Sequence, residues 1–254
     1  MNAVQPVFAV WARNFRVWRK LAAASLVGNF GDPFLYLLGL GYGLGLFIGE
    51  MSGIPYMAFL ASGILCSSAM NTATFEGLYS AFTRMTQQYT WEGMLATPLT
   101  IRDVVAGEMF WAATKSLISG TAIFIVAGIL GGIQNWDTAL LALPVVLLTG
   151  LCFAGLALVI CTLAPSYDFF MYYFTLAVTP MFLFCGVFYP IDSLPAVVQG
   201  IAQVLPLTHA VALMRPLLTE LPLIQPLLHV AVLAAYAAAS FTLAVRLAKR
   251  RLLR

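Results

Sequence analysis

Charged residues are scarce in this chain, and their scarcity decides its broad class. Only 9% of the 254 residues are charged, while 61% are hydrophobic. A soluble globular domain carries roughly 25% charged residues, so the composition excludes that class and predicts a protein that crosses the membrane several times. The four cysteines all lie inside apolar runs. There they behave as small apolar side chains and indicate neither a disulfide framework nor a metal cluster.

The sequence also lacks the motifs of an enzyme that works alone. None of the lysines (Lys20, Lys115, Lys249) follows a glycine, so no phosphate-binding GKS or GKT loop occurs, and neither HExxH nor GxSxG is present. The acidic residues are scattered, and His209 and His229 are isolated, which is typical of structural histidines. Any energy source must come from another polypeptide. No cleavable signal pattern precedes the first apolar run, so we expect that run to stay in the mature chain.

Long apolar runs predict an all-α integral membrane protein with six transmembrane helices in a single domain, residues 1–254. Asp32 followed by Pro33 is a helix-start pattern, which places the start of the first spanning helix inside its run. From Pro33 to Ile48 the helix would measure about 24 Å, short of the ~30 Å hydrocarbon core, so it must start earlier, extend later or sit in thinned lipid. The runs are Leu26–Ile48, Met57–Phe82, Phe110–Leu130, Ala139–Leu163, Phe169–Phe188 and Leu227–Leu247.

The distribution of basic residues predicts the orientation of these spans. Of the 13 Lys and Arg residues, all but Arg215 fall in the N-terminal segment, near the 83–108 loop or in the C-terminal tail. The positive-inside rule then places both termini and that loop in the cytoplasm of a bacterium, with the spans in its inner membrane. The 164–168 link should be cytoplasmic by alternation, although it carries no positive charge. Lys115 is expected near its helix start, where its side chain can snorkel to the interface.

Residues 5–21 predict an amphipathic helix. Phe8, Trp11, Phe15 and Trp18 line one side, and Arg13, Arg16 and Lys20 line the other. Such a helix is typical of the interface of an anionic leaflet. The alternative is that the aromatic side packs on protein; the adjoining span favours the interface.

The longest polar interruption in the N-terminal two thirds of the chain is residues 84–103. It predicts a short helix from Tyr89 to Ala96, stopped by Pro98. Trp91, Met94 and Leu95 then share one apolar face. Two interpretations stay open: the face docks into a groove of a partner, or the loop folds back onto its own helix ends.

Polar residues inside the spans usually face the protein interior or a water-filled path. In the second run Ser68, Thr72, Glu76 and Tyr79 share a face, with Asn71 beside it. Glu76 serves either a structural hydrogen bond or a substrate contact. The candidate lining of a substrate path is Asn29, Asp32, Tyr36, Ser68, Thr72 and Glu76.

The 189–226 segment contains two apolar stretches too short to cross a bilayer, Ala196–Leu205 and Thr208–Leu218, separated by Pro206. They predict re-entrant or interfacial helices on the non-cytoplasmic face. The residues singled out in this outer region are Gly186, Phe188, Tyr189, Pro190, Pro195, Pro206 and Arg215.

Two stretches resemble the ABC-2-type exporter permeases. Trp91-Glu-Gly-Met-Leu-Ala-Thr-Pro-Leu99 is similar to the cytoplasmic coupling loop of that family. Gly186-Val-Phe-Tyr-Pro190, Leu194-Pro195 and the stretch from Leu205 to Arg215 are similar to its C-terminal region. The resemblance covers nearly the whole chain and looks closest to the nodulation protein J branch, whose members export lipo-chitin oligosaccharides with a separate ATPase.

The resemblance implies a transporter of two permease copies and two ATPase subunits, in which this chain is not an enzyme. ATP and Mg would bind the ATPase, and no cofactor, metal or nucleic acid would bind this chain. Glu92 would pair with a basic residue of the ATPase, and an amphiphilic substrate would pass at the permease dimer interface, beside spans one, two and five and the membrane lipids. The implied coupling residues are Tyr89, Trp91, Glu92, Gly93, Met94, Leu95, Thr97 and Pro98.

Other functions are kept as alternatives. Within the family, relatives handle drugs, polysaccharides or lipids. Outside it, a membrane-embedded lipid-modifying enzyme would need a polar cluster, for which Asp32, Glu76 and Tyr79 are the candidates. A channel or scaffold would pass ions without nucleotide.

Overall fold

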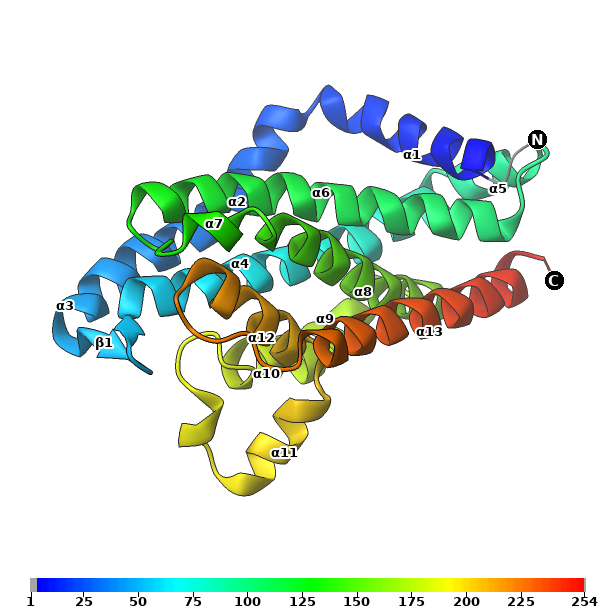
Figure 1. Ribbon diagram of the computed structural model, residues 1–254. Helices are drawn as coiled ribbons and strands as arrows, with labels where there is room; N and C mark the ends of the chain where they lie inside the picture. Colours follow the sequence, from blue (N-terminus) through cyan, green and yellow to red (C-terminus); the bar gives the residue numbers. More distant parts are fainter. Residues whose placement is uncertain (1–3, 254) are drawn as a thin grey trace.

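The computed structural model describes residues 4–253; within them, the side chains of Val4, Ala24, residues 26–30 and Asp32 are not described. The described chain is almost entirely helical, with one two-stranded hairpin of β1 (Glu50–Met51) and β2 (Ile54–Pro55). Long helices run side by side along the molecule (Figure 1). This confirms an all-α membrane protein.

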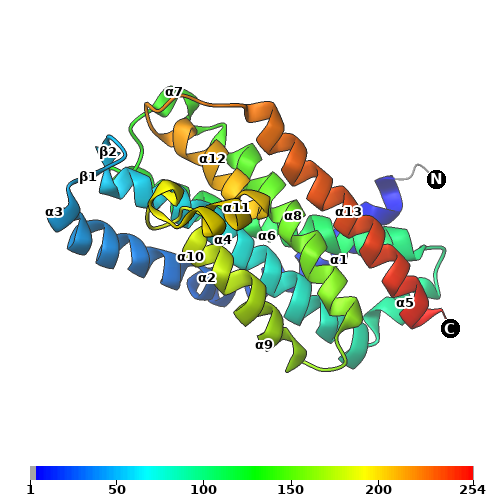
Figure 2. The ribbon, with the colours of Figure 1, turned by 90° about the horizontal axis from the view of Figure 1, so that it is seen from below.

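In the part of the chain that the structure describes, four helical segments are long and apolar enough to cross a membrane. Helix α4 (Tyr56–Phe75) continues through the π-helices η2 (Glu76–Ser80) and η3 (Thr83–Gln87), and α6 covers Ile101–Ile129. The third segment joins α7 (Trp136–Ala139) to α8 (Ala142–Leu163), and the fourth is α13 (Pro226–Leu252). Helix α8 packs against α4, α6 and α13 at the centre of the bundle (Figure 2).

Two further apolar segments are shorter. One comprises α2 (Ala22–Tyr36), η1 (Leu37–Leu44) and α3 (Gly45–Ile48), and the other comprises α9 (Phe169–Tyr173), η4 (Phe174–Val178) and α10 (Thr179–Phe184). Their described apolar parts are Pro33–Ile48 and Phe169–Phe184. At ~1.5 Å per residue each part covers less than the ~30 Å core.

The predicted helix start at Asp32 and Pro33 is wrong. The helix begins at Ala22 and carries Pro33 in its interior. The physical reason is that an apolar environment favours an unbroken helix, because backbone groups freed by a break have no water to bond. An earlier start was one of the three remedies expected for the short distance from Pro33 to Ile48.

Helix α6 also begins earlier than predicted. Its N-cap is Thr100, which accepts a hydrogen bond from the backbone N–H of Asp103, while the Asp103 carboxylate accepts one from the Thr100 N–H. This capping box starts the helix at Ile101 rather than Phe110. Lys115 therefore lies well inside the helix, where its Nζ pairs with Glu76 at 2.8 Å. The prediction that Lys115 snorkels from a helix start is wrong.

Helix α1 (Val4–Arg19) turns much of its aromatic side onto α6, beside which it lies in Figure 1. Trp11 donates through Nε1 to Thr114 Oγ1 at 3.0 Å, and the rings of Trp11, Phe15 and Trp18 all contact the ring of Trp111. Trp111 thus covers part of these three rings with an aromatic surface within the protein, and the location of the helix in the membrane interface stays a prediction. Packing on protein was the stated alternative.

The segment before α13 contains η5 (Ile191–Ser193), α11 (Ala196–Val204) and α12 (Pro206–Leu218). Helices α11 and α12 meet at 87°. The break falls at Leu205, because Pro206 occupies the first position of α12. Helix α12 packs on α4, α8 and α13, whereas α11 projects from the bundle (Figure 1).

The two ends of the bundle collect different links. Arg251, near the C-terminus, donates to the carbonyls of Cys161, Thr162 and Ala164, so the 164–168 link lies at the C-terminal end together with α5 (Thr90–Leu95) (Figure 1). At the other end the 131–138 link bonds the Leu218 carbonyl through the N–H of Gln134. The folded chain thus separates the links as alternation predicts.

Candidate functional site

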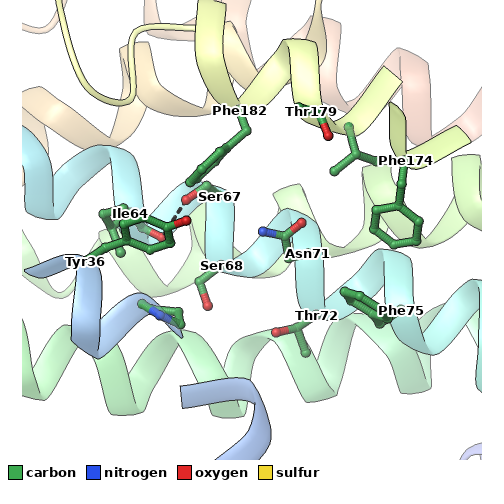
Figure 3. A pocket seen from close by; sticks show the side chains of 12 residues that line it. Tyr36, Ile64, Ser67, Ser68, Asn71, Thr72, Phe75, Phe174, Thr179 and Phe182 are labelled. Carbon is green, nitrogen blue, oxygen red and sulfur yellow. Dashed lines mark hydrogen bonds between the residues drawn. The ribbon is translucent and has the colours of Figure 1, made fainter. Parts of the chain in front are cut away.

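A cavity of about 280 Å³ lies between the first, second and fifth apolar segments (Figure 3). Tyr36 comes from α2, Asn71 and Thr72 from α4, and Phe174 and Phe182 from η4 and α10. Hydroxyl and amide groups of α4 face aromatic rings of the other two segments across the space. The cavity can therefore hold a molecule with both polar and apolar parts.

Three of the six predicted path residues line this cavity: Tyr36, Ser68 and Thr72. Ser68 lies 3.5 Å from Ser119 between their hydroxyl oxygens, which joins α4 to α6. The side chains of Asn29 and Asp32 lie outside those that the structure describes. Whether the cavity residues contact substrate stays a prediction.

Asn71 is one of three polar cavity residues that sequence reasoning left out of the predicted path, the others being Ser67 and Thr179. It lies three residues after Ser68 and is more exposed than Ser68 or Thr72. Figure 3 shows its amide beside the space, between Ser68 and Thr72. The three-residue spacing from Ser68 was the available signal, because residues at i and i+3 neighbour each other on a helix.

Glu76 does not line the cavity and is fully engaged inside the protein. Only 4% of it is exposed, and its carboxylate accepts from Trp111 Nε1 at 2.8 Å and pairs with Arg84 at 2.9 Å and Lys115 at 2.8 Å. Glu76 therefore has the structural hydrogen bonds that one of its two interpretations expected, and its contact with substrate stays a prediction. A buried carboxylate needs such partners, because an unpaired charge in a low dielectric is costly.

Arg84 joins Glu76 to a second buried carboxylate, Glu108 of α6. The guanidinium donates from Nε to Glu108 Oε1 at 2.9 Å and from NH2 to Oε2 at 2.6 Å, which is a bidentate pair. We call Glu76, Arg84, Glu108 and Lys115 the charge network. Two carboxylates face two cations, so the network is electrically balanced. Sequence reasoning missed Glu108, because its partner Arg84 lies across the polar loop.

Helix α5 is attached to the charge network through Trp91. Trp91 is buried, and its Nε1 donates to Glu108 Oε1 at 3.2 Å. Met94 and Leu95 are partly buried and pack on the same core. Of the two interpretations left open, the structure shows Trp91 folded back onto this chain's own helices, and docking of the rest of the helix on a partner stays a prediction. The short helix itself is confirmed, at Thr90–Leu95.

The opposite face of α5 is open. Tyr89 is 61% exposed and adopts a left-handed backbone with φ of 51°, while Glu92, Gly93, Thr97 and Pro98 are exposed. A non-glycine residue at positive φ is uncommon and marks a tightly determined turn. The exposed coupling residues thus form one surface at the end of the bundle that also carries the C-terminus.

Helix α1 supports this end of the molecule as well. Arg13 donates to Thr90 Oγ1 at 3.4 Å, where α5 begins, and to Asn14 Oδ1 at 2.9 Å. Burial lowers the pKa of Arg13, with Arg84 acting in the same direction and Glu108 against it. Arg13 thus ties α1 to the first residue of α5.

Arg215 organises the outer region. Its hydrogen bonds go to neutral acceptors: Nε donates to Ser62 Oγ at 3.1 Å, and NH2 donates to the Gly186 carbonyl at 2.6 Å. Its guanidinium carbon stacks 3.5 Å from the centre of the Phe59 ring. Gly186 has φ of 79°, which favours glycine. Arg215 therefore fixes the turn after α10 onto α4.

The remaining outer residues have different surroundings. The Phe188 ring meets the Phe182 ring edge-on and the Tyr36 ring at a tilt, so it borders the cavity. Pro206 is buried at the start of α12, Pro195 is exposed before α11, and Tyr189 and Pro190 are half-buried. This segment can approach α4 closely because Gly63 has no side chain. A Cβ on Gly63 would lie 2.6 Å from the Val187 carbonyl oxygen.

Comparison with known proteins identifies the family of this chain. Residues 5–218 match the family of ABC-2 type transporters. The chain belongs to that family. The permease is 50% identical to the nodulation protein J of Rhizobium leguminosarum bv. viciae over 246 residues, 97% of this chain and 95% of that protein. It is equally similar, 50% over 97% of this chain and 94% of the relative, to the nodulation protein J of Bradyrhizobium diazoefficiens.

A more distant relative is the inner membrane transport permease YadH of Escherichia coli, 24% identical over 80% of this chain and 79% of its own length. The permease is therefore the transmembrane subunit of an ABC exporter and not an enzyme. The nucleotide is bound by a partner ATPase. Glu76, one candidate of the enzyme alternative, is held by the charge network, and the Tyr79 ring packs among Tyr167, Phe170 and Phe174.

Proposed function

We propose that the permease exports a lipo-oligosaccharide of the nodulation-factor type across the inner membrane, as a homodimer with two ATPase subunits. The observation that carries this proposal is the 50% identity to nodulation protein J over 97% of the chain. Identity of that extent covers the cavity and the coupling end alike. The lipo-chitin substrate class follows from the resemblance to that branch.

The proposed topology has six spans, with both termini and α5 in the cytoplasm. The exposed basic residues Arg246 and Lys249 support this orientation, because they lie in the C-terminal part of α13, which ends on the same side of the bundle as α5 (Figure 1). The segments Ala22–Ile48 and Phe169–Phe184 then act as the first and fifth spans. The bent pair α11 and α12 forms the re-entrant region around the outer exit.

In the proposed mechanism the ATPase grips the exposed surface of α5 formed by Tyr89, Glu92, Gly93, Thr97 and Pro98. Movement of α5 reaches the spanning helices through Trp91, because its Nε1 bonds Glu108 of α6. Arg84 then transmits this movement to Glu76 of the second span. A rigid, charge-balanced connection of this kind transmits displacement without leaving a buried charge unpaired.

The substrate would follow the cavity between the first, second and fifth spans. The amide of Asn71 and the hydroxyls of Tyr36 and Ser67 suit sugar hydroxyls, and Phe174 and Phe182 suit an acyl chain. The permease dimer interface beside these spans completes the path. Membrane lipids would border its open side.

The test uses the permease reconstituted in vesicles with its ATPase and a lipo-chitin oligosaccharide. Glu92→Arg reverses a charge on the exposed face of α5 and should lower ATP-driven export at least tenfold while the fold stays intact. Glu50→Arg makes the same change on an exposed residue of β1, at the opposite end of the bundle, and should leave export unchanged.

Normal export by Glu92→Arg contradicts the coupling role of α5. Export that ignores the oligosaccharide but accepts a drug or a polysaccharide contradicts the substrate class alone. Residues 89–97 mapped to the periplasmic side by labelling of single cysteines contradict the orientation.

A further inference from the structure

A second, larger hollow lies away from the proposed substrate cavity. It has a volume of about 670 Å³ and separates the connection between α5 and α6 from the C-terminal part of α13. Its walls are apolar, with Leu95 and Leu99 on one side and Phe241 and Val245 on the other. We call this hollow the C-terminal groove.

The rim of the C-terminal groove is strongly basic. Arg102, Arg246 and Lys249 border it and are exposed. Among the described residues none of the three forms a salt bridge or a side-chain hydrogen bond. Arg250 joins Arg246 and Lys249 around an adjoining hollow of about 410 Å³. The nearby carboxylate of Asp103 is turned to Thr100, from which it accepts two hydrogen bonds.

Apolar walls with a basic rim fit a ligand that is apolar along its length and anionic at one end. A free inorganic anion would leave the apolar walls in contact with water, and a neutral lipid would leave three cations without a counterion. Phe241 and Val245 belong to α13, which crosses the membrane, so acyl chains can reach them at bilayer depth. Only 22% of the apolar 18-residue stretch of α13 is buried inside the protein.

We propose that the C-terminal groove binds one anionic phospholipid. Its phosphate pairs with Arg246, Lys249 and Arg102, and an acyl chain lies along Val245 and Phe241. Clusters of Lys and Arg at the end of a spanning helix attract anionic lipid headgroups. That the lipid comes from the cytoplasmic leaflet rests on the proposed orientation. Because Leu95 and Leu99 form one wall, the bound lipid also packs against the segment that follows α5.

The test measures lipid retention on the purified permease without ATPase, by native mass spectrometry after addition of cardiolipin, phosphatidylglycerol or phosphatidylethanolamine. The wild-type permease should retain the two anionic lipids and not the zwitterionic one. Arg246→Gln with Lys249→Gln should reduce retention at least tenfold. The matched control, Arg19→Gln with Lys20→Gln, removes the same charges from exposed positions outside the groove and should retain both anionic lipids.

A second variant addresses the apolar wall. Val245→Trp fills the groove while keeping every charge, and it should also reduce retention; its helix content and unfolding temperature verify the fold. Equal loss in the groove and control variants overturns the site, because surface charge alone then explains binding. Equal retention of phosphatidylethanolamine, or displacement by millimolar inorganic phosphate, also overturns it.

Two protein occupants are tested by one further variant, Val245→Cys, in native membranes. A disulfide-linked permease dimer, or a cross-link to the ATPase, shows that protein covers the groove and overturns the lipid proposal. Because retention is measured without ATPase or transport, its failure is separate from failure of the proposed function.

Discussion

Two mostly buried arginines at opposite ends of the bundle are compensated by different kinds of partner. Arg84 is bridged by the carboxylates of Glu76 and Glu108. Arg215 has no carboxylate partner among the described residues and is held by two carbonyls, the Ser62 hydroxyl and the Phe59 ring. One cation is therefore balanced by charge, and the other is solvated by dipoles and an aromatic face.

The difference indicates what each site can tolerate. Loss of Arg84 leaves two carboxylates, 4% and 1% exposed, with Lys115 as the one remaining cation. Loss of Arg215 leaves neutral groups. The charge network joins η2 and η3 to α6, and Trp91 attaches α5 to it, so it lies on the proposed coupling path. Arg215 fixes a turn to α4 and acts on the shape of the outer region.

The largest effect is expected for Arg84→Leu. It should destabilise the permease by about 3–5 kcal/mol, the cost of breaking a buried ion pair from one side. Reversible unfolding in mixed micelles measures this. Adding Glu108→Leu should restore part of the stability, because Glu76 still pairs with Lys115. A double variant no more stable than the single one contradicts charge imbalance as the cause.

A smaller loss is expected for Arg215→Met, roughly 1–3 kcal/mol, because the carbonyl of Gly186 and the hydroxyl of Ser62 lose their donor. The same unfolding assay compares it with Arg84→Leu. Arg215→Lys keeps the charge without the fork of donors and should fall between wild type and Met. If Arg215→Met costs more than Arg84→Leu, the contrast between the two sites is wrong.

Trp91→Phe should cost about 1.5 kcal/mol, since one hydrogen bond to a charged group is lost and the ring stays buried. Its sharper consequence is on coupling. The amount of substrate exported per ATP hydrolysed should fall by more than the small loss of stability explains, because α5 loses its hydrogen bond to Glu108. Trp136→Phe changes a largely exposed tryptophan at the other end of the bundle and should alter neither quantity.

The smallest effect is expected at the histidine pair between α12 and α13. His209 Nε2 donates to the Gln203 carbonyl at 2.9 Å, so its Nδ1 must accept from His229 Nδ1 at 2.8 Å in the neutral pair. His229→Leu should cost about 1 kcal/mol in the unfolding assay. The two histidines are structural as predicted, although they pair with each other rather than standing alone. No measurable change would mean that the pair contributes nothing to outer-region stability.

Local pattern was enough for much of this protein. The scarcity of charge fixed the membrane class, because a bilayer excludes ionised groups that a soluble surface needs. The short helix at Thr90–Leu95 and the break before Pro206 follow from residue-level preferences and were predicted within a residue or two. The motif near Trp91 indicated the family.

Which residues far apart in the sequence contact each other was decided only by the tertiary structure. An amphipathic pattern says that Trp91 and Trp11 have an apolar side to cover, but not whether lipid, another protein or this chain covers it. Here Glu108 and Trp111 of α6 do so. In the same way Glu76 reads as a polar residue in a span until the fold brings Arg84 and Lys115 to it. Periodicity is a property of one helix, whereas burial and charge balance depend on which helices meet.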